Sequence, residues 1–230
     1  DTAKQLTIEE EFWLISGNEI SPVAEGEAPE TPTGHVGCIP EALATFDIQS
    51  PFVDRPKGQV SGAQALSQAR ERECFTILNH PYSLVPWVAF DWTSDDYDAI
   101  EVWNGSGGGF DLYDYHGYNA WRCDLLAGRP VVAVGASDNH RVNQHIPGDL
   151  LNPALGWPHV RVRVVERSWA GIIEGLKSGQ VTIQEGASLI TLEGFDENNN
   201  RVREGAPTKL RVKGALDERG VSSTLSIRRL

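Results

Sequence analysis

The chain has 230 residues, of which 40% are hydrophobic, enough for one large domain or for one domain with a small appendage. Its 20 Lys and Arg residues against 32 Asp and Glu residues give a formal net charge of -12, which argues against a nucleic-acid or anionic-membrane surface, because phosphate backbones and anionic lipids attract clustered basic side chains. No apolar run is long enough to span a membrane, while a small phosphorylated substrate stays compatible because bound cations reverse the local field.

Four apolar segments end in the same way, and each is predicted to be a buried strand. Each is followed by a side chain that can bind a metal or form hydrogen bonds, and a nearby Gly or Pro ends the strand. The carboxyl ends of the strands of a (β/α) barrel form one rim, where active sites are assembled. The segments are 12–15 with Glu19, 74–78 with His80, 99–103 with Asn104, and 131–136 with Asp138 and His140. This arrangement indicates a metal-dependent hydrolase.

The motif Ser137-Asp138-Asn139-His140 is the most informative of these strand ends. Side chains alternate along a strand, so Asp138 and His140 would point the same way if the extended backbone continued through the motif. A carboxylate and an imidazole directed together suit a metal site or a catalytic pair. A hydrogen-bonded pair without a metal is the alternative.

The rest of the pattern predicts a mixed α/β chain. Ser61 is a plausible N-cap for the first helix, and Gly128 and Gly179 are typical stops for the other two. Helices are predicted over residues 61–73, 116–127 and 168–179, and further strands over 160–164, 181–183 and 189–192. The apolar stretch 34–39 contains one further histidine, His35.

The three cysteines are odd in number and widely spaced, so neither a disulfide framework nor a zinc knuckle is expected. Cys74 and Cys123 lie in apolar surroundings and are predicted to be small core residues.

Two domains are predicted, a barrel over residues 1–194 and a small all-β extension over 195–230. The barrel part supplies fewer strands than a closed barrel needs, and a barrel without its first strands would expose a long unpaired edge. We therefore expect the barrel to be N-terminally incomplete.

Five motifs occur in the order and approximate spacing of the PHP (polymerase and histidinol phosphatase) superfamily of metallohydrolases, which the chain resembles over roughly residues 8–193. The branch that it resembles most is the CehA/McbA type, which often carries a β extension. The motifs are Gly17-Asn18-Glu19-Ile20-Ser21, Gly34-His35, Asn79-His80-Pro81, Ile100-Glu101-Val102-Trp103-Asn104-Gly105 and Ala136-Ser137-Asp138-Asn139-His140.

The resemblance implies a distorted seven-stranded (β/α) barrel that holds two or three divalent ions, zinc, manganese or iron. Glu19 matches the carboxylate that bridges two metals, and His35 and His80 match the imidazoles that complete one of those sites. Asp138 and His140 match the terminal pair, each serving a different metal. The opening His-x-His and Asp-His motifs of the family are absent and would lie upstream of Asp1.

The implied reaction is hydrolysis of a small phosphoester by a metal-activated hydroxide, with Glu19, Asp138 and His140 at the catalytic cluster. Arg141 could hold a phosphate as a bidentate donor, and Asn104 could orient either loop backbone or the substrate. Hydrolysis of a carbamate or a carboxylic ester by the same cluster is one alternative. A non-catalytic module that binds a ligand or scaffolds other domains is another.

Each site residue also has a structural alternative. Glu19 and Arg141 could be surface charges, His80 before a proline could be a turn residue, and His35 could be structural.

Overall fold

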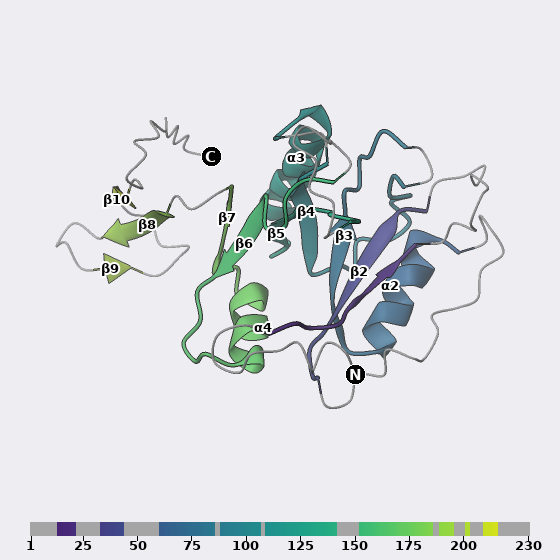
Figure 1. Ribbon diagram of the computed structural model, residues 1–230, viewed down its shortest axis with the longest axis horizontal. Helices are drawn as coiled ribbons and strands as arrows, with labels where there is room; N and C mark the ends of the chain where they lie inside the picture. The colour runs from purple at the N-terminus through teal and green to yellow at the C-terminus, as the bar shows by residue number, and fades with distance from the viewer. Residues whose placement is uncertain are drawn as a thin grey trace. The chain divides into compact units, whose positions relative to one another are not determined.

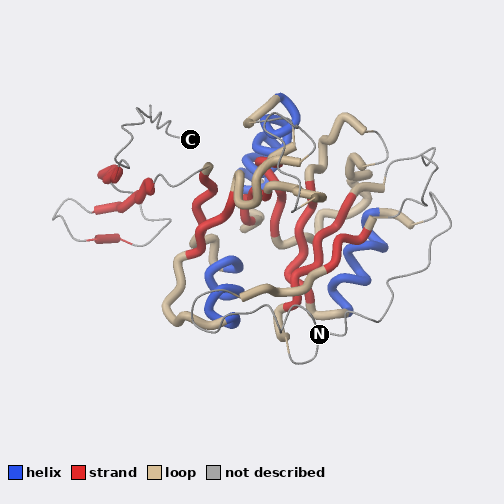
Figure 2. Tube along the Cα trace, in the orientation of Figure 1, coloured by secondary structure: helices blue, strands red, loops and turns tan. Residues whose placement is uncertain are grey.

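A computed structural model of the chain describes the following residues: 13–21, 33–43, 60–85, 88–106, 109–141, 152–185, 189–195, 201–202 and 209–215 (Figures 1 and 2). The chain divides into two compact units, Asp1–Gln184 and Glu185–Leu230. This division falls earlier than the domain boundary after residue 194 that the sequence suggests, which stays a prediction.

The first unit is built on a mixed five-stranded sheet with the strand order β1-β2-β3-β4-β5. Strands β1, β2 and β3 pair antiparallel, whereas β3, β4 and β5 pair parallel. The strands are β1 (Asn18–Ile20), β2 (His35–Pro40), β3 (Cys74–Asn79), β4 (Ala99–Asn104) and β5 (Val132–Ala136). A separate antiparallel pair contains β6 (His159–Val162) and β7 (Val181–Gln184). The α/β class is confirmed, while a seven-stranded barrel is not confirmed by the described strands.

Three described helices complete this unit: α2 (Gly62–Glu71), α3 (Leu112–Leu126) and α4 (Trp169–Lys177). Helix α2 packs beside β2 and β3, and α3 packs along β4 (Figure 1). Ser61 caps α2 through a capping box, and Ser168 caps α4, because their side chains accept backbone N–H groups that have no partner within the helix. Helix α3 begins earlier than expected, because Asp111 and Asp114 form a capping box there.

Alternate residues of the strands enter two hydrophobic clusters. Ile100 packs in one cluster with Leu66 of α2, and its neighbour Ala99 packs in the other with Ile173 of α4. The period of two along a strand explains this division, because successive side chains point to opposite faces of the sheet. The sheet is thus covered by apolar side chains on both faces, while Thr76 and Glu101 bring buried polar groups into β3 and β4.

Three sequence predictions about local structure are wrong. Trp13–Ile15 of the predicted first strand is not a strand; the strand lies further along, at β1, so Glu19 sits within a strand rather than after one. Cys38 of β2 and Cys74 of β3 form a disulfide, and Cys123 is exposed on α3 rather than buried in the core. The pairing of β2 with β3 brings the two distant cysteines together, which their spacing in the sequence does not show.

The second unit contains an antiparallel three-stranded sheet with the order β10-β8-β9. Its strands are β8 (Leu189–Phe195), β9 (Arg201–Val202) and β10 (Lys209–Ala215). Among the described residues, no helix has the length and apolar character needed to cross a bilayer.

Candidate metal centre

Three side chains from three neighbouring strands converge at one end of the sheet. Glu19 lies on β1, His35 begins β2, and His80 directly follows β3. Because β2 runs antiparallel to β3, its first residue pairs with the last residue of β3, and His35 therefore lies opposite Asn79. We call Glu19, His35 and His80 the donor triad, since one nitrogen or oxygen atom of each lies within 4.8 Å of the others.

The three donor atoms have the spacing of ligands around one cation. His35 Nδ1 lies 3.0 Å from His80 Nε2 and 3.3 Å from Glu19 Oε1, and His80 Nε2 lies 3.9 Å from Glu19 Oε1. Distances of this size are compatible with neighbouring nitrogen and oxygen ligands of one zinc ion, whose bonds to such ligands are about 2.0 Å long. His35 Nδ1 and His80 Nε2 are also hydrogen-bonded to each other, so the triad would hold a divalent ion after the proton between these two nitrogens has left.

The Glu19 carboxylate is held in its ionised form. Burial on its own would raise the pKa of Glu19, but the hydrogen bond and charge of His35, with contributions from Asn79 and His80, outweigh it and lower the pKa to about 2. The Asn79 amide donates to Glu19 Oε1 over 2.7 Å. Gly37 leaves the room that this amide needs, because a Cβ atom there would lie 2.9 Å from Asn79 Oδ1. A charged carboxylate is thus available to a cation over the whole physiological range.

The two histidines present opposite ring nitrogens to the centre, and each has its other nitrogen occupied. Ser21 Oγ lies 2.9 Å from Nε2 of His35, so Nδ1 of that ring faces the triad. Glu101 Oε2 accepts from the backbone N–H of His80 over 2.7 Å and from its Nδ1 over 3.0 Å, so Nε2 faces the triad. A partner on the second nitrogen is the usual support of a metal-binding histidine, because it fixes both tautomer and ring orientation.

His80 is charged in the metal-free protein. Burial would lower the pKa of His80, but the hydrogen bond and charge of Glu101, together with Asp138 and Glu19, raise it to about 9. Its backbone adopts a left-handed conformation with φ of 30°, which non-glycine residues rarely adopt. A strained backbone next to three acidic groups is typical of a functional site, where the surrounding contacts hold the strain in place.

Asp138 and His140 form a second group beyond the triad. His140 Nε2 lies 2.9 Å from Asp138 Oδ1, and we call these residues the Asp138–His140 pair. The extended backbone stops at Ala136, and Asp138 adopts a left-handed φ of 50°. The side chain of Asn139 holds this turn, because it accepts from the backbone N–H of Arg141 and donates to the carbonyl of Pro153. The two side chains therefore meet through a turn, not through the strand alternation that the sequence suggests.

Asn104 lies between the two groups. Its Nδ2 is 3.1 Å from His80 Nδ1, and it donates over 3.3 Å to Glu101 and to Asp138 Oδ2. Its Oδ1 accepts from the backbone N–H of Ser106, whose hydroxyl donates to Asp138. Both ends of this buried amide are thus engaged with the protein, and its predicted contact with substrate stays a prediction.

The structure brings together three of the five predicted metal ligands, Glu19, His35 and His80. The Asp138–His140 pair is linked to them through Asn104 and is not part of the triad among the described residues. Arg141 is exposed, and its predicted role in substrate binding stays a prediction.

Sequence reasoning missed the supporting residues Ser21, Asn79, Ser106 and Glu101. For Glu101 a signal was present, because a carboxylate inside the apolar strand Ala99–Asn104 must have a buried polar partner.

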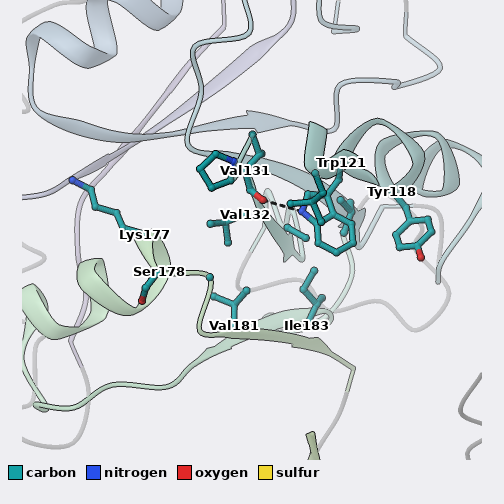
Figure 3. Close-up of a pocket in the computed structure, with 13 residues that line it drawn as sticks. Tyr118, Trp121, Val131, Val132, Lys177, Ser178, Val181 and Ile183 are labelled. Atoms are coloured by element: carbon teal, nitrogen blue, oxygen red, sulfur yellow. Dashed lines mark hydrogen bonds between the residues drawn. The ribbon is translucent and has the colours of Figure 1, made fainter. Parts of the chain in front are cut away.

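An apolar pocket lies elsewhere and carries no such chemistry. It has a volume of about 630 Å³ and lies between α3, β5 and the segment around β7 (Figure 3). Val131, Val132, Val181 and Ile183 line it with Trp121, whose indole N–H donates to the carbonyl of Val131. It contains no member of either group.

No protein-family model and no curated protein matches this chain. Among solved structures it resembles a two-domain protein from Bacteroides vulgatus ATCC 8482 that contains a predicted PHP-like metal-dependent phosphoesterase, with 22% sequence identity and a TM-score of 0.48. The match covers 75% of this chain and 44% of that chain, so this chain spans less than half of that protein. This resemblance is too distant to assign residues or an activity, and membership of the PHP superfamily stays a prediction.

Proposed function

We propose that this chain belongs to a metal-dependent hydrolase in which Glu19, His35 and His80 hold a divalent cation, and that its substrate is a phosphoester. The observation that carries the proposal is the spacing of the donor triad, whose three atoms are 3.0, 3.3 and 3.9 Å apart. Two imidazoles and one carboxylate suit zinc, manganese or iron, whereas magnesium and calcium prefer oxygen ligands throughout. When bound, such an ion supplies the positive charge that activates a water near neutral pH and polarises a phosphoryl or carbonyl oxygen.

The protein's own groups prepare the triad for this role. Asn79 holds the Glu19 carboxylate, and Ser21 holds the distal nitrogen of His35. Glu101 accepts a hydrogen bond from Nδ1 of His80. The other ring nitrogen, Nε2, can then bind the metal ion once it has lost its own proton. These contacts exist before any ion binds, and a preorganised site loses little entropy when it binds its ligand.

The Asp138–His140 pair supplies the other half of the proposed site. His140 Nε2 is hydrogen-bonded to Asp138 Oδ1 over 2.9 Å, which holds a carboxylate and an imidazole side by side. We assign this pair to a further cation, and Arg141 and Asn104 to substrate binding. His140 is exposed, with 69% of its side chain accessible, so substrate can reach it directly.

The test is hydrolysis by the metal-loaded protein of matched panels of phosphomonoesters, phosphodiesters, carboxylic esters and carbamates. We expect cleavage within the phosphoester panels, and loss of at least about 100-fold in the Glu19→Gln variant, because a neutral amide replaces a charged ligand. Glu41→Gln serves as the matched control, since Glu41 pairs with Lys177 and has no part in the triad. Cleavage of carbamates or carboxylic esters alone would overturn the substrate class but keep the hydrolase. No cleavage in any panel, with zinc, manganese and iron each bound, would overturn the hydrolase itself.

A further inference from the structure

We propose that Glu101 is a positioning residue, which fixes the His80 ring toward the donor triad and, through Asn104, ties Asp138 to the same centre. This inference rests on the metal site proposed above and extends it to a side chain on β4. Glu101 contacts no member of the triad except His80 in the described contacts, so its effect on a bound ion is exerted through that ring.

A β-bulge in β4 is what aims Glu101 at this centre. The pairing of β4 with β5 shifts register between Glu101 and Trp103, so one extra residue is inserted there. In a regular strand, residues three apart point to opposite faces, yet Asn104 Nδ2 lies 3.3 Å from both carboxylate oxygens of Glu101. The bulge therefore places both side chains on one side of the sheet.

Helix α3 holds the bulge in place. Gly117 lets the helix come close, because a Cβ atom there would lie 2.9 Å from the carbonyl oxygen of Glu101. Asp114 of the same helix accepts from the backbone N–H of Asn104 over 2.8 Å. A backbone N–H that turns away from the β-ladder at a buried bulge needs such a partner. The local geometry is thus supported from outside the strand.

The burial of Glu101 also calls for an explanation. Only 5% of its side chain is exposed, and its ion-pair partner among the described residues is His80. A buried carboxylate without a strong partner is costly, and replacing such a pair with apolar residues often stabilises a protein. Glu101 also contacts the one residue of the triad that has a left-handed backbone, and a single oxygen holds both its N–H and its ring. Positioning of His80 accounts for both observations.

The test compares zinc binding by wild type, Glu101→Gln, Glu101→Asp and the Glu41→Gln control, measured by competition with a chelating dye. We expect both Glu101 variants to bind zinc about 10–100-fold more weakly, since outer partners of metal-binding histidines have effects of that size. Glu101→Asp keeps the charge but shortens the side chain, so it separates position from charge. Its fold is checked by circular dichroism, and it keeps the test decisive if Glu101→Gln fails to fold.

A second readout is the nitrogen NMR spectrum of the histidine rings in the zinc-loaded proteins. Wild type should show His80 with a proton on Nδ1 and zinc on Nε2, and the Glu101 variants should lose that single pattern. A purely structural role would leave the pattern unchanged in every variant that folds. If wild type binds zinc and the folded Glu101→Asp and Glu101→Gln variants bind it with the same affinity, this inference is overturned while the proposed metal site stands. Absence of zinc binding by wild type would overturn the proposed metal site and this inference with it.

Discussion

The two groups of the candidate site are held by different kinds of strand pairing. The donor triad lies on β1, β2 and β3, where antiparallel pairing places the start of one strand beside the end of the next. The Asp138–His140 pair follows β5, a parallel strand, and is shaped by a turn that Asn139 holds. The triad is fixed by sheet register and the pair by local hydrogen bonds, so the triad should be the stronger metal site and the pair the more adaptable one.

The largest effect is expected from a substitution that removes a member of the triad. His80→Ala removes one of three donors and leaves Glu101 buried without its partner, so zinc affinity should fall by at least about 100-fold. His140→Ala should change the affinity of the triad far less, since His140 is exposed and lies outside it. Competition with a chelating dye measures both. Equal losses in the two variants would contradict the division of the site into two groups.

The next prediction concerns pH. Zinc can bind His80 only after its Nε2 proton leaves, and the pKa of that ring is raised to about 9. Zinc affinity should therefore rise about tenfold per pH unit between pH 6 and 8, because one proton is released on binding. Titration calorimetry in buffers of different ionisation enthalpy counts that proton. An affinity that does not change with pH would show that His80 is not the ligand.

The stability of the metal-free protein should fall as the pH rises on the alkaline side, whereas zinc affinity rises there. Because the pKa of Glu19 is lowered, this residue contributes stability that is present above pH 4.5 and is lost as the pH falls toward 2. Because the pKa of His80 is raised, this residue contributes stability that is present below pH 6.5 and is lost as the pH rises toward 9. Both contributions are complete only between pH 4.5 and 6.5. Urea unfolding at several pH values checks this, and His80→Gln should remove the alkaline loss.

A smaller effect is expected from Gly37→Ala. The added methyl group displaces the Asn79 amide, which then no longer donates to Glu19, so the pKa of Glu19 should rise and zinc affinity should fall on the order of tenfold. Carbon NMR of the Glu19 carboxyl group follows the pKa directly. An unchanged pKa in a folded variant would show that the amide does not support this carboxylate.

The smallest effect on zinc is expected from Asn139→Ala, which loosens the turn that holds the Asp138–His140 pair. The variant loses two hydrogen bonds and should be less stable by about 1–2 kcal/mol, with unchanged zinc affinity at the triad. Thermal unfolding and the dye competition together measure the two quantities. A large loss of zinc affinity would show that the two groups are one site.

The sequence singled out the residues of the donor triad, whose role as metal ligands stays a prediction. Glu19, His35 and His80 were all identified, and the caps at Ser61 and Ser168 follow from local rules. The helix caps need only local rules, and His80 follows an apolar run, whereas His35 was assigned only through the family resemblance.

The sequence could not predict features that depend on pairing between distant segments. The antiparallel direction of β2 decides that His35 meets His80, and it also joins Cys38 to Cys74. The bulge that turns Glu101 toward His80 depends on the register of β4 against β5. No local pattern determines strand direction or register across long loops, which is why the supporting residues were missed.

The most direct test of the central claim is the position of zinc in crystals of the protein grown with the metal, located by anomalous scattering at the zinc edge. The account predicts a peak about 2.0 Å from Oε1 of Glu19, Nδ1 of His35 and Nε2 of His80. A zinc-loaded crystal with no peak among these three atoms, and with the two imidazoles still in mutual contact, would contradict it.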